Sequence, residues 1–207
     1  MNGFTAEPTT LDSHPPMETG GSDAALVAQA QAGNAQAFAL LYQRYLDRVY
    51  DFASRRVESV EAAQDATQTV FLRALSSLPT CRDGEAFAGW LFAIARNVIT
   101  DGYRSRRYTT VIYDDAFDLP DQADSPEEMA IMADQRRQLA DARRRCLNPV
   151  ERELLDLRLQ DLGDKEIARA MGRTHGATRT AQYRLVQKLR DCMNRLRPGQ
   201  EANHVAP

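Results

Sequence analysis

Apolar residues recur at helical spacing along most of this chain, and the clearest run extends from Phe87 to Arg107. The apolar positions of this run are Phe87, Trp90, Leu91, Ile94, Ala95, Val98, Ile99 and Tyr103. Their intervals of three, one or four residues place them on one face of an α-helix, so we expect that face to bury in a core. The remaining positions include polar and cationic residues, namely Arg96, Asn97, Thr100, Asp101, Arg104, Arg106 and Arg107.

The polar face of this helix offers guanidinium, amide and hydroxyl groups to an anionic ligand. Single-stranded nucleic acid fits that description, because Arg and Trp stack on bases while Arg and Lys hold phosphates. A core helix whose outer face is merely solvated would show the same pattern. The helix by itself therefore leaves both interpretations open.

Helical periodicity also predicts a bundle upstream of this run. The apolar positions in residues 22–56 indicate a short helix and a longer one with a break near Gly33-Asn34, and Ser22 or Asp23 can cap the first. Residues 60–78 predict another helix. Its expected buried stripe is Ala66, Val70, Phe71, Ala74, Leu75 and Leu78, and its outward residues are Asp65, Gln68, Thr69 and Leu72.

Capping signals divide the last part of the chain into short helices. Ser125-Pro126-Glu127-Glu128 predicts the start of a helix that runs to about Cys146, and Asn148-Pro149-Val150-Glu151 predicts the next. The next signals are Gly163 as a stop, Asp164 as a cap, Gly172 as a turn, and Thr174 as the cap of a final helix from His175 to about Arg197. A short helix, a glycine turn and a longer basic helix predict a helix-turn-helix.

The charge of the chain is unevenly distributed. Its formal net charge of −3 argues against a simple nucleic-acid binder. However, residues 161–197 hold nine basic and four acidic residues, whereas residues 114–128 hold seven acidic residues and no basic one. The overall figure therefore conceals a basic module and an acidic strip.

The cysteines and the hydropathy of the chain narrow its class. Cys81, Cys146 and Cys192 are isolated and odd in number, so neither a disulfide framework nor a zinc site is expected. No run is long and apolar enough to span a membrane, and the N-terminus lacks the pattern of a signal peptide. We therefore expect a cytoplasmic protein without a metal or another cofactor.

The segment FAGWLFAIARNVITDGYRSRR resembles the promoter-melting helix of bacterial RNA polymerase sigma factors of the sigma-70 family. It is most similar to the extracytoplasmic-function (ECF) group, whose pattern is F-x-x-W-L-x-x-I-A-R-N followed by D-x-x-R. The matching residues are Phe87, Trp90, Leu91, Ile94, Ala95, Arg96, Asn97, Asp101 and Arg104. The resemblance implies that the −10 promoter element is contacted by Arg82, Trp90, Arg96, Asn97, Asp101, Arg104, Arg106 and Arg107.

Two neighbouring segments extend the resemblance. The helix over 60–78 is similar to the one whose D-x-x-Q-E face grips a coiled coil of the polymerase's largest subunit; here Thr69 stands where Glu is usual. The resemblance implies that polymerase is bound by Asp65, Gln68, Thr69 and Leu72. The loop Pro79–Gly84, in which Asp83 can cap the helix from Phe87, is implied to help hold a flipped-out base. Without the family, Asp65 and Gln68 are simply solvated surface, and the loop is a plain connection.

The last module resembles the −35-reading region of the same family. The matching residues are Leu147, Pro149, Glu151, Arg152, Glu153, Leu155, Leu157, Arg158, Glu166, Ile167, Ala168, Gly172 and Gly176. Thr174, His175 and Thr178 depart from the family pattern, so helix packing is expected to rest on Leu185, Val186 and Leu189. The implied −35 contacts are Arg173, Thr174, His175, Gly176, Arg179, Thr180, Tyr183, Arg184 and Lys188. Arg179 suits a bidentate contact to guanine, whereas Arg173, Arg184 and Lys188 suit phosphates.

These observations predict an all-α fold of two helical domains, a sigma region 2 bundle and a helix-turn-helix sigma region 4, joined by a flexible acidic linker. The expected boundaries are a disordered tail over 1–21, region 2 over 22–108, the linker over 109–133, region 4 over 134–197 and a tail over 198–207. In the family, the linker threads the polymerase near its RNA path; by itself it is a solubilising spacer.

The resemblance implies an alternative sigma factor rather than an enzyme. Its partners would be core RNA polymerase, through the largest-subunit coiled coil and the flap, promoter DNA and, as in many family members, an anti-sigma factor. Two other classes stay open. A self-sufficient helix-turn-helix regulator would bind an operator without polymerase, and a nucleic-acid enzyme would need a cluster of carboxylates or a nucleophile–base pair.

Overall fold

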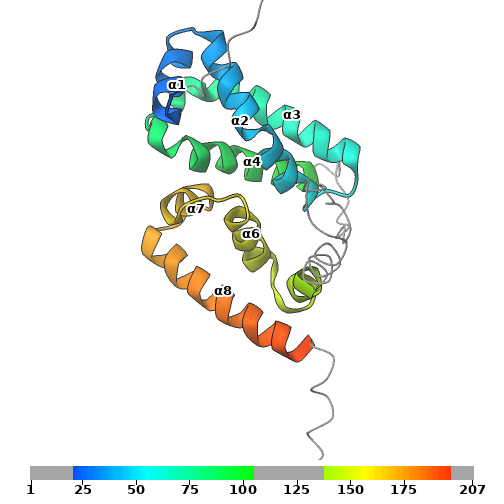
Figure 1. The fold of residues 1–207 in the computed structure, drawn as a ribbon. Coiled ribbons are helices and arrows are strands. Elements are labelled where there is room, and N and C mark those ends of the chain that lie inside the picture. The colour runs from blue at the N-terminus through cyan, green and yellow to red at the C-terminus, as the bar shows by residue number, and fades with distance from the viewer. Residues whose placement is uncertain (1–20, 105–137, 197–207) are drawn as a thin grey trace, which may run out of the picture.

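The computed structural model describes residues 21–104 and 138–196, and every regular element within these ranges is a helix (Figure 1). The predicted all-α fold is thereby confirmed. The acidic linker, the expected helix start at Ser125, both tails apart from Gly21, and the predicted DNA contacts Arg106 and Arg107 lie outside the described residues.

The N-terminal module contains four α-helices. They are α1 (Asp23–Gln31), α2 (Ala35–Ser54), α3 (Val60–Ser77) and α4 (Phe87–Arg104), with the 3-10 turns η1 (Leu78–Thr80) and η2 (Gly84–Ala86) between α3 and α4. The side chains of Ser22, Asn34 and Ser59 accept hydrogen bonds from the first turns of α1, α2 and α3. Ser22 is therefore the cap of the first helix. Asp83 precedes η2 but makes no side-chain cap, so that prediction was wrong.

The C-terminal module contains a helical segment over 138–146, then α6 (Pro149–Arg158), α7 (Asp164–Ala170) and α8 (His175–Leu196). The predicted capping box at Asn148 and Glu151 is present. Gly163, not Asp164, occupies the cap position of α7, because Glu166 reaches back to its backbone N–H. Gly172 has φ +63°, which glycine adopts without strain, and it makes the turn of the helix-turn-helix.

The core of the N-terminal module is built on aromatic side chains from facing helices. Phe52 of α2 meets Phe92 of α4 edge-to-face with ring centroids 5.4 Å apart, and Tyr45 meets Phe87 in the same way. Phe92 is fully buried although the interval pattern of the sequence did not include it. Its burial follows from the position of α4, which packs against both α2 and α3 and also against the C-terminal module.

Three positions differ in burial from the sequence-based expectation. Leu75 of α3 is 51% exposed and Val186 of α8 is 44% exposed, so neither belongs to the buried stripe to which periodicity assigned it. Thr178 is fully buried instead, and its hydroxyl donates to the Thr174 carbonyl oxygen. Thr178 therefore packs in the core of the last module, because its polar group finds a partner within its own helix.

Cys146 and Cys192 form a disulfide with their Cα atoms 6.3 Å apart, although the sequence analysis expected no disulfide. Their separation of 46 residues has no recognisable spacing signal. The packing of α8 across the helical segment over 138–146 brings the two side chains together. Cys81 remains a free, buried cysteine, and burial raises the pKa of its thiol.

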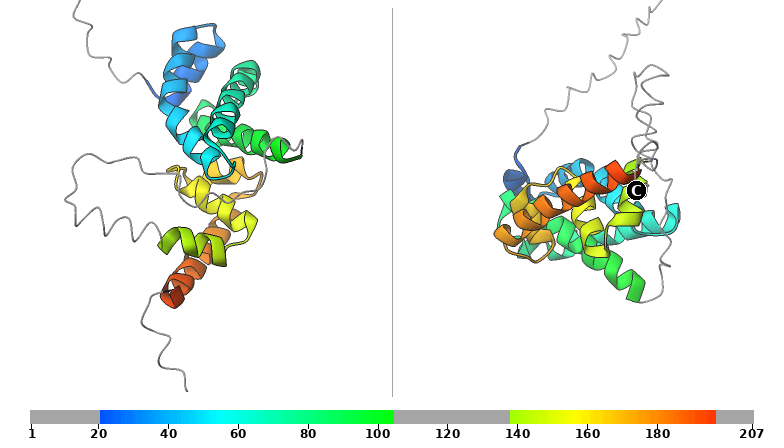
Figure 2. Two further views of the ribbon diagram at one scale, coloured as in Figure 1. Left: turned by 90° about the vertical axis from the view of Figure 1, so that its right-hand side faces the viewer. Right: turned by 90° about the horizontal axis from the view of Figure 1, so that it is seen from below.

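The two modules pack directly against one another, with α7 and α6 beneath α4 and α8 on the far side (Figures 1 and 2). Their buried apolar residues form one continuous cluster. Helices α4 and α7 approach closely at Gly89, where a Cβ atom would lie 2.8 Å from the carbonyl oxygen of Glu166 in α7. No side chain larger than hydrogen fits there while both helices stay in place.

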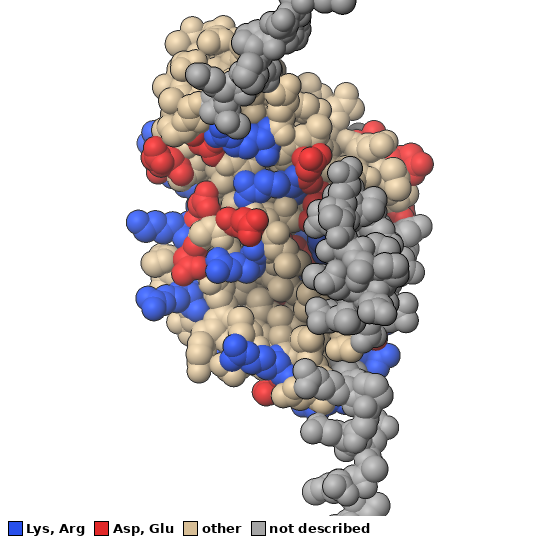
Figure 3. Space-filling view, viewed as in Figure 1, with Lys and Arg blue, Asp and Glu red and all other residues tan. Residues whose placement is uncertain are grey.

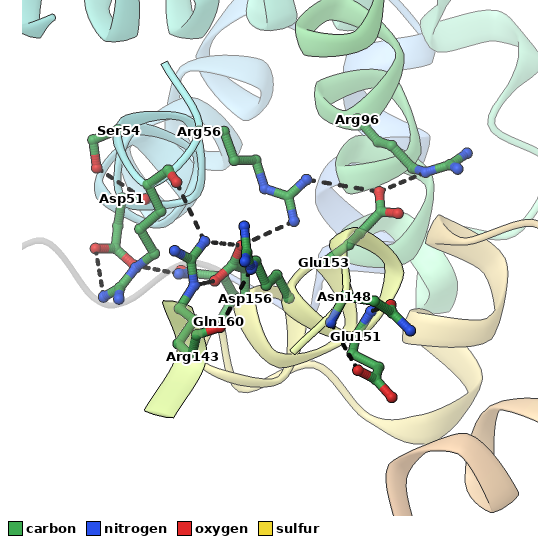
Figure 4. Close-up of polar contacts among 12 residues, drawn as sticks. Asp51, Ser54, Arg56, Arg96, Arg143, Asn148, Glu151, Glu153, Asp156 and Gln160 are labelled. Carbon is green, nitrogen blue, oxygen red and sulfur yellow. Dashed lines mark hydrogen bonds and ion pairs between the residues drawn. The ribbon is translucent and has the colours of Figure 1, made fainter. Parts of the chain in front are cut away.

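A seam of polar contacts runs beside this crossing. It joins α2, the turn after α2 and α4 of the N-terminal module to the C-terminal module (Figure 4). Arg56 donates to Asp156 at 3.0 Å and lies 3.7 Å from Glu153, and Arg96 donates to Glu153 at 2.6 Å. Farther along the seam, Arg48 donates to the Gln160 carbonyl oxygen, Gln160 donates to Asp51, and Arg143 donates to the Arg55 carbonyl oxygen at 3.3 Å. We call these contacts the interdomain seam.

Candidate nucleic-acid interface

The predicted −10 stripe of α4 is exposed. Asn97, Asp101 and Arg104 occur at intervals of four and three residues, and all three are exposed along one side of the helix. Helix α4 holds them in place because its opposite face, which includes Leu91, Ala95 and Val98, is buried. An amide, a carboxylate and a guanidinium are thus presented in one row to solvent.

The carboxylate in this row has a partner that the sequence did not indicate. Arg73 of α3 donates to Asp101 at 3.1 Å, and both side chains are about half exposed. An exposed pair of this kind adds little stability, but it restricts where the Asp101 carboxylate points. Arg73 is therefore a positioning residue for the stripe.

A residue of α1 holds the loop before α4 through hydrogen bonds. The side-chain amide of Gln31 donates to the carbonyl oxygens of Leu78 and Cys81, each at 2.9 Å. Trp90 is only partly buried, and the centroid of its ring lies 5.7 Å from that of the Phe87 ring. Arg82 is exposed on the loop. The loop is thus held at both ends of η1, which positions Arg82 before the start of α4.

The predicted polymerase-binding face of α3 is also accessible. Asp65 and Gln68 are exposed, Thr69 is intermediate, and Leu72 is 61% exposed despite being a large apolar residue. Leu75, unexpectedly exposed, adds a second leucine near Leu72. An apolar pair with flanking polar groups is the usual composition of a protein-binding surface.

The predicted −35 residues lie on the turn before α8 and on its exposed side. Those that are exposed are Arg173, Thr174, His175, Gly176, Arg179, Thr180, Tyr183 and Arg184. Thr174 caps the helix by accepting from the Ala177 backbone N–H at 3.3 Å. The helix-turn-helix therefore presents a continuous polar surface, with Arg179 about one turn after the start of α8.

Lys188 differs from the other predicted −35 residues because it already has an anionic partner. Its Nζ donates to both carboxylate oxygens of Glu151, at 2.9 and 2.7 Å. Partial burial raises the pKa of Glu151, but the hydrogen bonds from Lys188 and from the Asn148 backbone outweigh it and lower the pKa below that of an ordinary glutamate. The pair ties the start of α6 to the middle of α8.

Arg96 also has an anionic partner within the protein. Its Nε atom donates to Glu153 of the C-terminal module at 2.6 Å. Over the visible junction of the two modules, positive and negative side chains are interleaved (Figure 3). Part of the basic surface of α4 thus faces protein carboxylates.

Within residues 21–104 and 138–196, no group of three or more His, Cys, Asp or Glu side chains is arranged to hold a metal ion. Among the helices described there, none has the length and apolar content required to cross a bilayer. Exposed polar rows lie on α3, α4 and α8 in the described part of the chain.

Comparisons with known proteins find similar sequences. The sequence profile described as sigma-70 region 2 matches residues 41–109. The chain is 41% identical over 167 residues to the ECF RNA polymerase sigma factor BldN of Streptomyces coelicolor, covering 79% of this chain but 63% of BldN. It is 35% identical over 196 residues to the ECF RNA polymerase sigma factor SigD of Mycobacterium tuberculosis, covering 88% of this chain and 89% of SigD.

A solved structure shares the fold. The structure of CnrH in complex with the cytosolic domain of CnrY superimposes with a TM-score of 0.59 at 24% identity, over 84% of this chain and 97% of that chain. At this identity the likeness concerns the fold alone.

Proposed function

The chain belongs to the ECF RNA polymerase sigma factors, and from this we propose that it binds core RNA polymerase and directs it to specific promoters. It reads −35 and −10 elements and assists in opening the DNA. The observation that carries the proposal is the separation of three exposed polar rows on three different helices, α3, α4 and α8. Each row suits a different partner.

The division of labour follows from the chemistry of each row. The α3 row, with Asp65, Gln68 and the exposed Leu72, suits a protein partner, namely the largest-subunit coiled coil of the polymerase. The α4 row suits unpaired bases and phosphates, and the α8 row suits duplex read through its major groove. A second polymerase contact, with the flap, falls to the C-terminal module.

Three further assignments belong to this proposal. An anti-sigma factor is a candidate partner, since CnrH is seen in complex with the cytosolic domain of CnrY. The protein acts in the cytoplasm, where core polymerase and promoter DNA are found. It is a transcription factor rather than an enzyme, and it needs no cofactor of its own.

Run-off transcription tests the proposal. Core polymerase supplied with this protein and a genomic library should yield discrete transcripts that are absent with core polymerase alone. Footprinting with and without core enzyme separates the self-sufficient regulator, which would protect an operator by itself. A nuclease assay with Mg²⁺ tests the enzyme alternative, and protection without polymerase or cleavage of DNA would overturn the proposal.

A further inference from the structure

Gly176, in the first turn of α8, has no role in the fold that would require a glycine. It lies within a helix and does not have a positive φ, unlike Gly172 in the preceding turn, where φ is +63°. A Cβ atom at Gly176 would have no atom within 4 Å apart from those of its chain neighbours and its own helix backbone, whereas at Gly89 it would collide with the backbone of Glu166. The protein by itself therefore has room for a side chain at Gly176.

A glycine at such a position makes the helix less stable. Glycine leaves the unfolded chain more conformational freedom than alanine does, and after proline it is the residue least favourable within a helix. Neither a turn nor a close contact in the described structure compensates for this loss at Gly176. A local choice that opposes the fold is typical of a functional site, where another requirement outweighs stability.

The side chains around Gly176 leave an opening on the exposed surface of α8. His175 and Ala177 are exposed on either side of it in the chain, and Ala177 contributes only a methyl group. Thr180, one turn along, leans toward Gly176, because helical side chains point toward the N-terminus. Its hydroxyl donates to the Gly176 carbonyl oxygen at 3.1 Å, and the position of a Cβ stays clear. The backbone of α8 is thus accessible at this point.

The opening lies among the residues predicted to read the −35 element. Arg179 is three residues and Tyr183 is seven residues after Gly176, so the three lie on one side of α8, and each is exposed. In a helix-turn-helix, the N-terminal residues of the second helix contact the base edges in the major groove. A bulky side chain at Gly176 would therefore stand between α8 and the duplex.

We propose that Gly176 is the point of closest approach between α8 and the −35 duplex. Its hydrogen atom lets the helix enter the groove to the depth at which the Arg179 side chain reaches the bases. This inference rests on the proposed function, because it takes promoter DNA as the ligand of α8. Gly176 acts by lacking a side chain, so it is a positioning residue for the contacts of its neighbours. The chain loses helix stability at this position and gains affinity for DNA.

Gly176→Ala distinguishes this role from a role in the fold. Replacing a glycine that the fold needs lowers stability, whereas Gly176→Ala should raise the melting temperature, because alanine favours the helix and its Cβ has room. The same variant should bind a −35 duplex roughly tenfold more weakly, as expected for the loss of one hydrogen bond to a charged group. Gly176→Leu, which places more atoms at the same point, should weaken binding further.

Asn194→Leu is the matched control for added bulk on α8. Asn194 lies 18 residues after Gly176, which is five turns of an α-helix, so it is exposed on the same side but about 27 Å farther along the axis. The major groove is about 12 Å wide, so a side chain at Asn194 lies outside the groove that holds the start of α8. This variant should bind the −35 duplex as tightly as wild type does.

The experiment uses the full chain with core polymerase and a fluorescent duplex carrying the −35 element that run-off transcription identifies for the wild type. Thermal melts of each free variant accompany the affinities, and affinity for core polymerase should not change. Unchanged duplex affinity of Gly176→Ala would overturn the proposal, and so would a lowered melting temperature, since the glycine would then serve the fold. Equal weakening by Asn194→Leu and Gly176→Leu would also overturn it. Failure of the sigma-factor proposal would appear separately, as absence of run-off transcripts with the wild type.

Discussion

Lys188 of α8 donates to both carboxylate oxygens of Glu151, which is also the third residue of the α6 capping box. One lysine therefore joins two helices of the last module while standing at a position predicted to hold DNA phosphate. Its two possible partners, a carboxylate and a phosphate, cannot both be fully engaged by one ammonium group.

Lys188→Ala should lower affinity for all DNA sequences about equally and reduce the salt slope of binding by about one. It should also lower the melting temperature, because Glu151 loses its partner. Lys165→Ala, at an exposed position of α7, is the control for stability. If the variant bound DNA and melted like wild type, Lys188 would neither contact phosphate nor stabilise the module.

The Glu151–Lys188 pair also predicts a pH dependence. The pKa of Glu151 is lowered in the folded protein. Its contribution to stability is therefore present at pH values above the pKa that Glu151 has in the unfolded chain, and it is lost as the pH falls through the lowered pKa of the folded state. Thermal melts between about pH 6 and about pH 3 should show this loss, and Lys188→Ala should reduce it. Identical pH profiles for the two proteins would contradict the assignment.

Arg179→Ala should reduce −35 discrimination by roughly 1–3 kcal/mol at one base pair, because a bidentate contact to guanine is lost. Arg184→Ala, nearby on the same helix, should instead weaken binding to every sequence. Affinities for a set of single-base-pair variants of the −35 element distinguish the two effects. Uniform weakening by Arg179→Ala would make it a phosphate contact.

Asp65→Ala with Gln68→Ala should weaken binding to core polymerase by about 1–3 kcal/mol without changing the melt, because both side chains are exposed. Asp47→Ala with Gln43→Ala is the matched control, since these residues have the same chemistry and are exposed on α2. Affinity for core enzyme is the measurement. If both double variants bind equally well, α3 does not carry the interface.

Asn97→Ala with Arg104→Ala should slow promoter opening while core binding is unchanged, because both side chains lie in the exposed row of α4. Permanganate reactivity of unpaired thymines in the −10 region follows opening directly. A premelted bubble template should rescue part of the defect. Opening at the wild-type rate would mean that this row is only a solvated surface.

Reduction of the Cys146–Cys192 disulfide should lower the free energy of unfolding by up to about 4 kcal/mol, since it encloses a loop of 46 residues. Melts with and without a reducing agent measure the difference. Cys81→Ala should keep the response and Cys146→Ser should abolish it. Equal melts of the oxidised and reduced wild type would contradict the prediction.

Local signals in the sequence predicted two helix starts correctly, although the caps predicted at Asp83 and Asp164 were wrong. Ser22 and the capping box at Asn148 and Glu151 act through backbone groups only a few residues away, so the pattern contains the whole interaction. Periodicity was less reliable at the edges of the buried faces. Leu75 and Val186 fit the spacing but face solvent, because no other helix of the described chain covers those positions.

The interdomain seam could not be predicted from the sequence. Arg96 and Glu153 are 57 residues apart in the sequence, and the residue pattern of neither helix indicates that it packs beside the other. Arg73 and Gln31 were missed for the same reason, since each acts on a segment contributed by another helix. Interactions of this kind arise only once the packing of the helices is known.

The Cys146–Cys192 disulfide makes the last module a covalent ring that contains α6, α7 and most of α8. The exposed turn at Asp161, where φ is +52°, lies inside that ring. A protease that cut the backbone at this turn would leave the two fragments joined through sulfur, and they would separate only on a reducing gel. The module thereby tolerates one break in its chain, a redundancy that non-covalent helix packing does not supply.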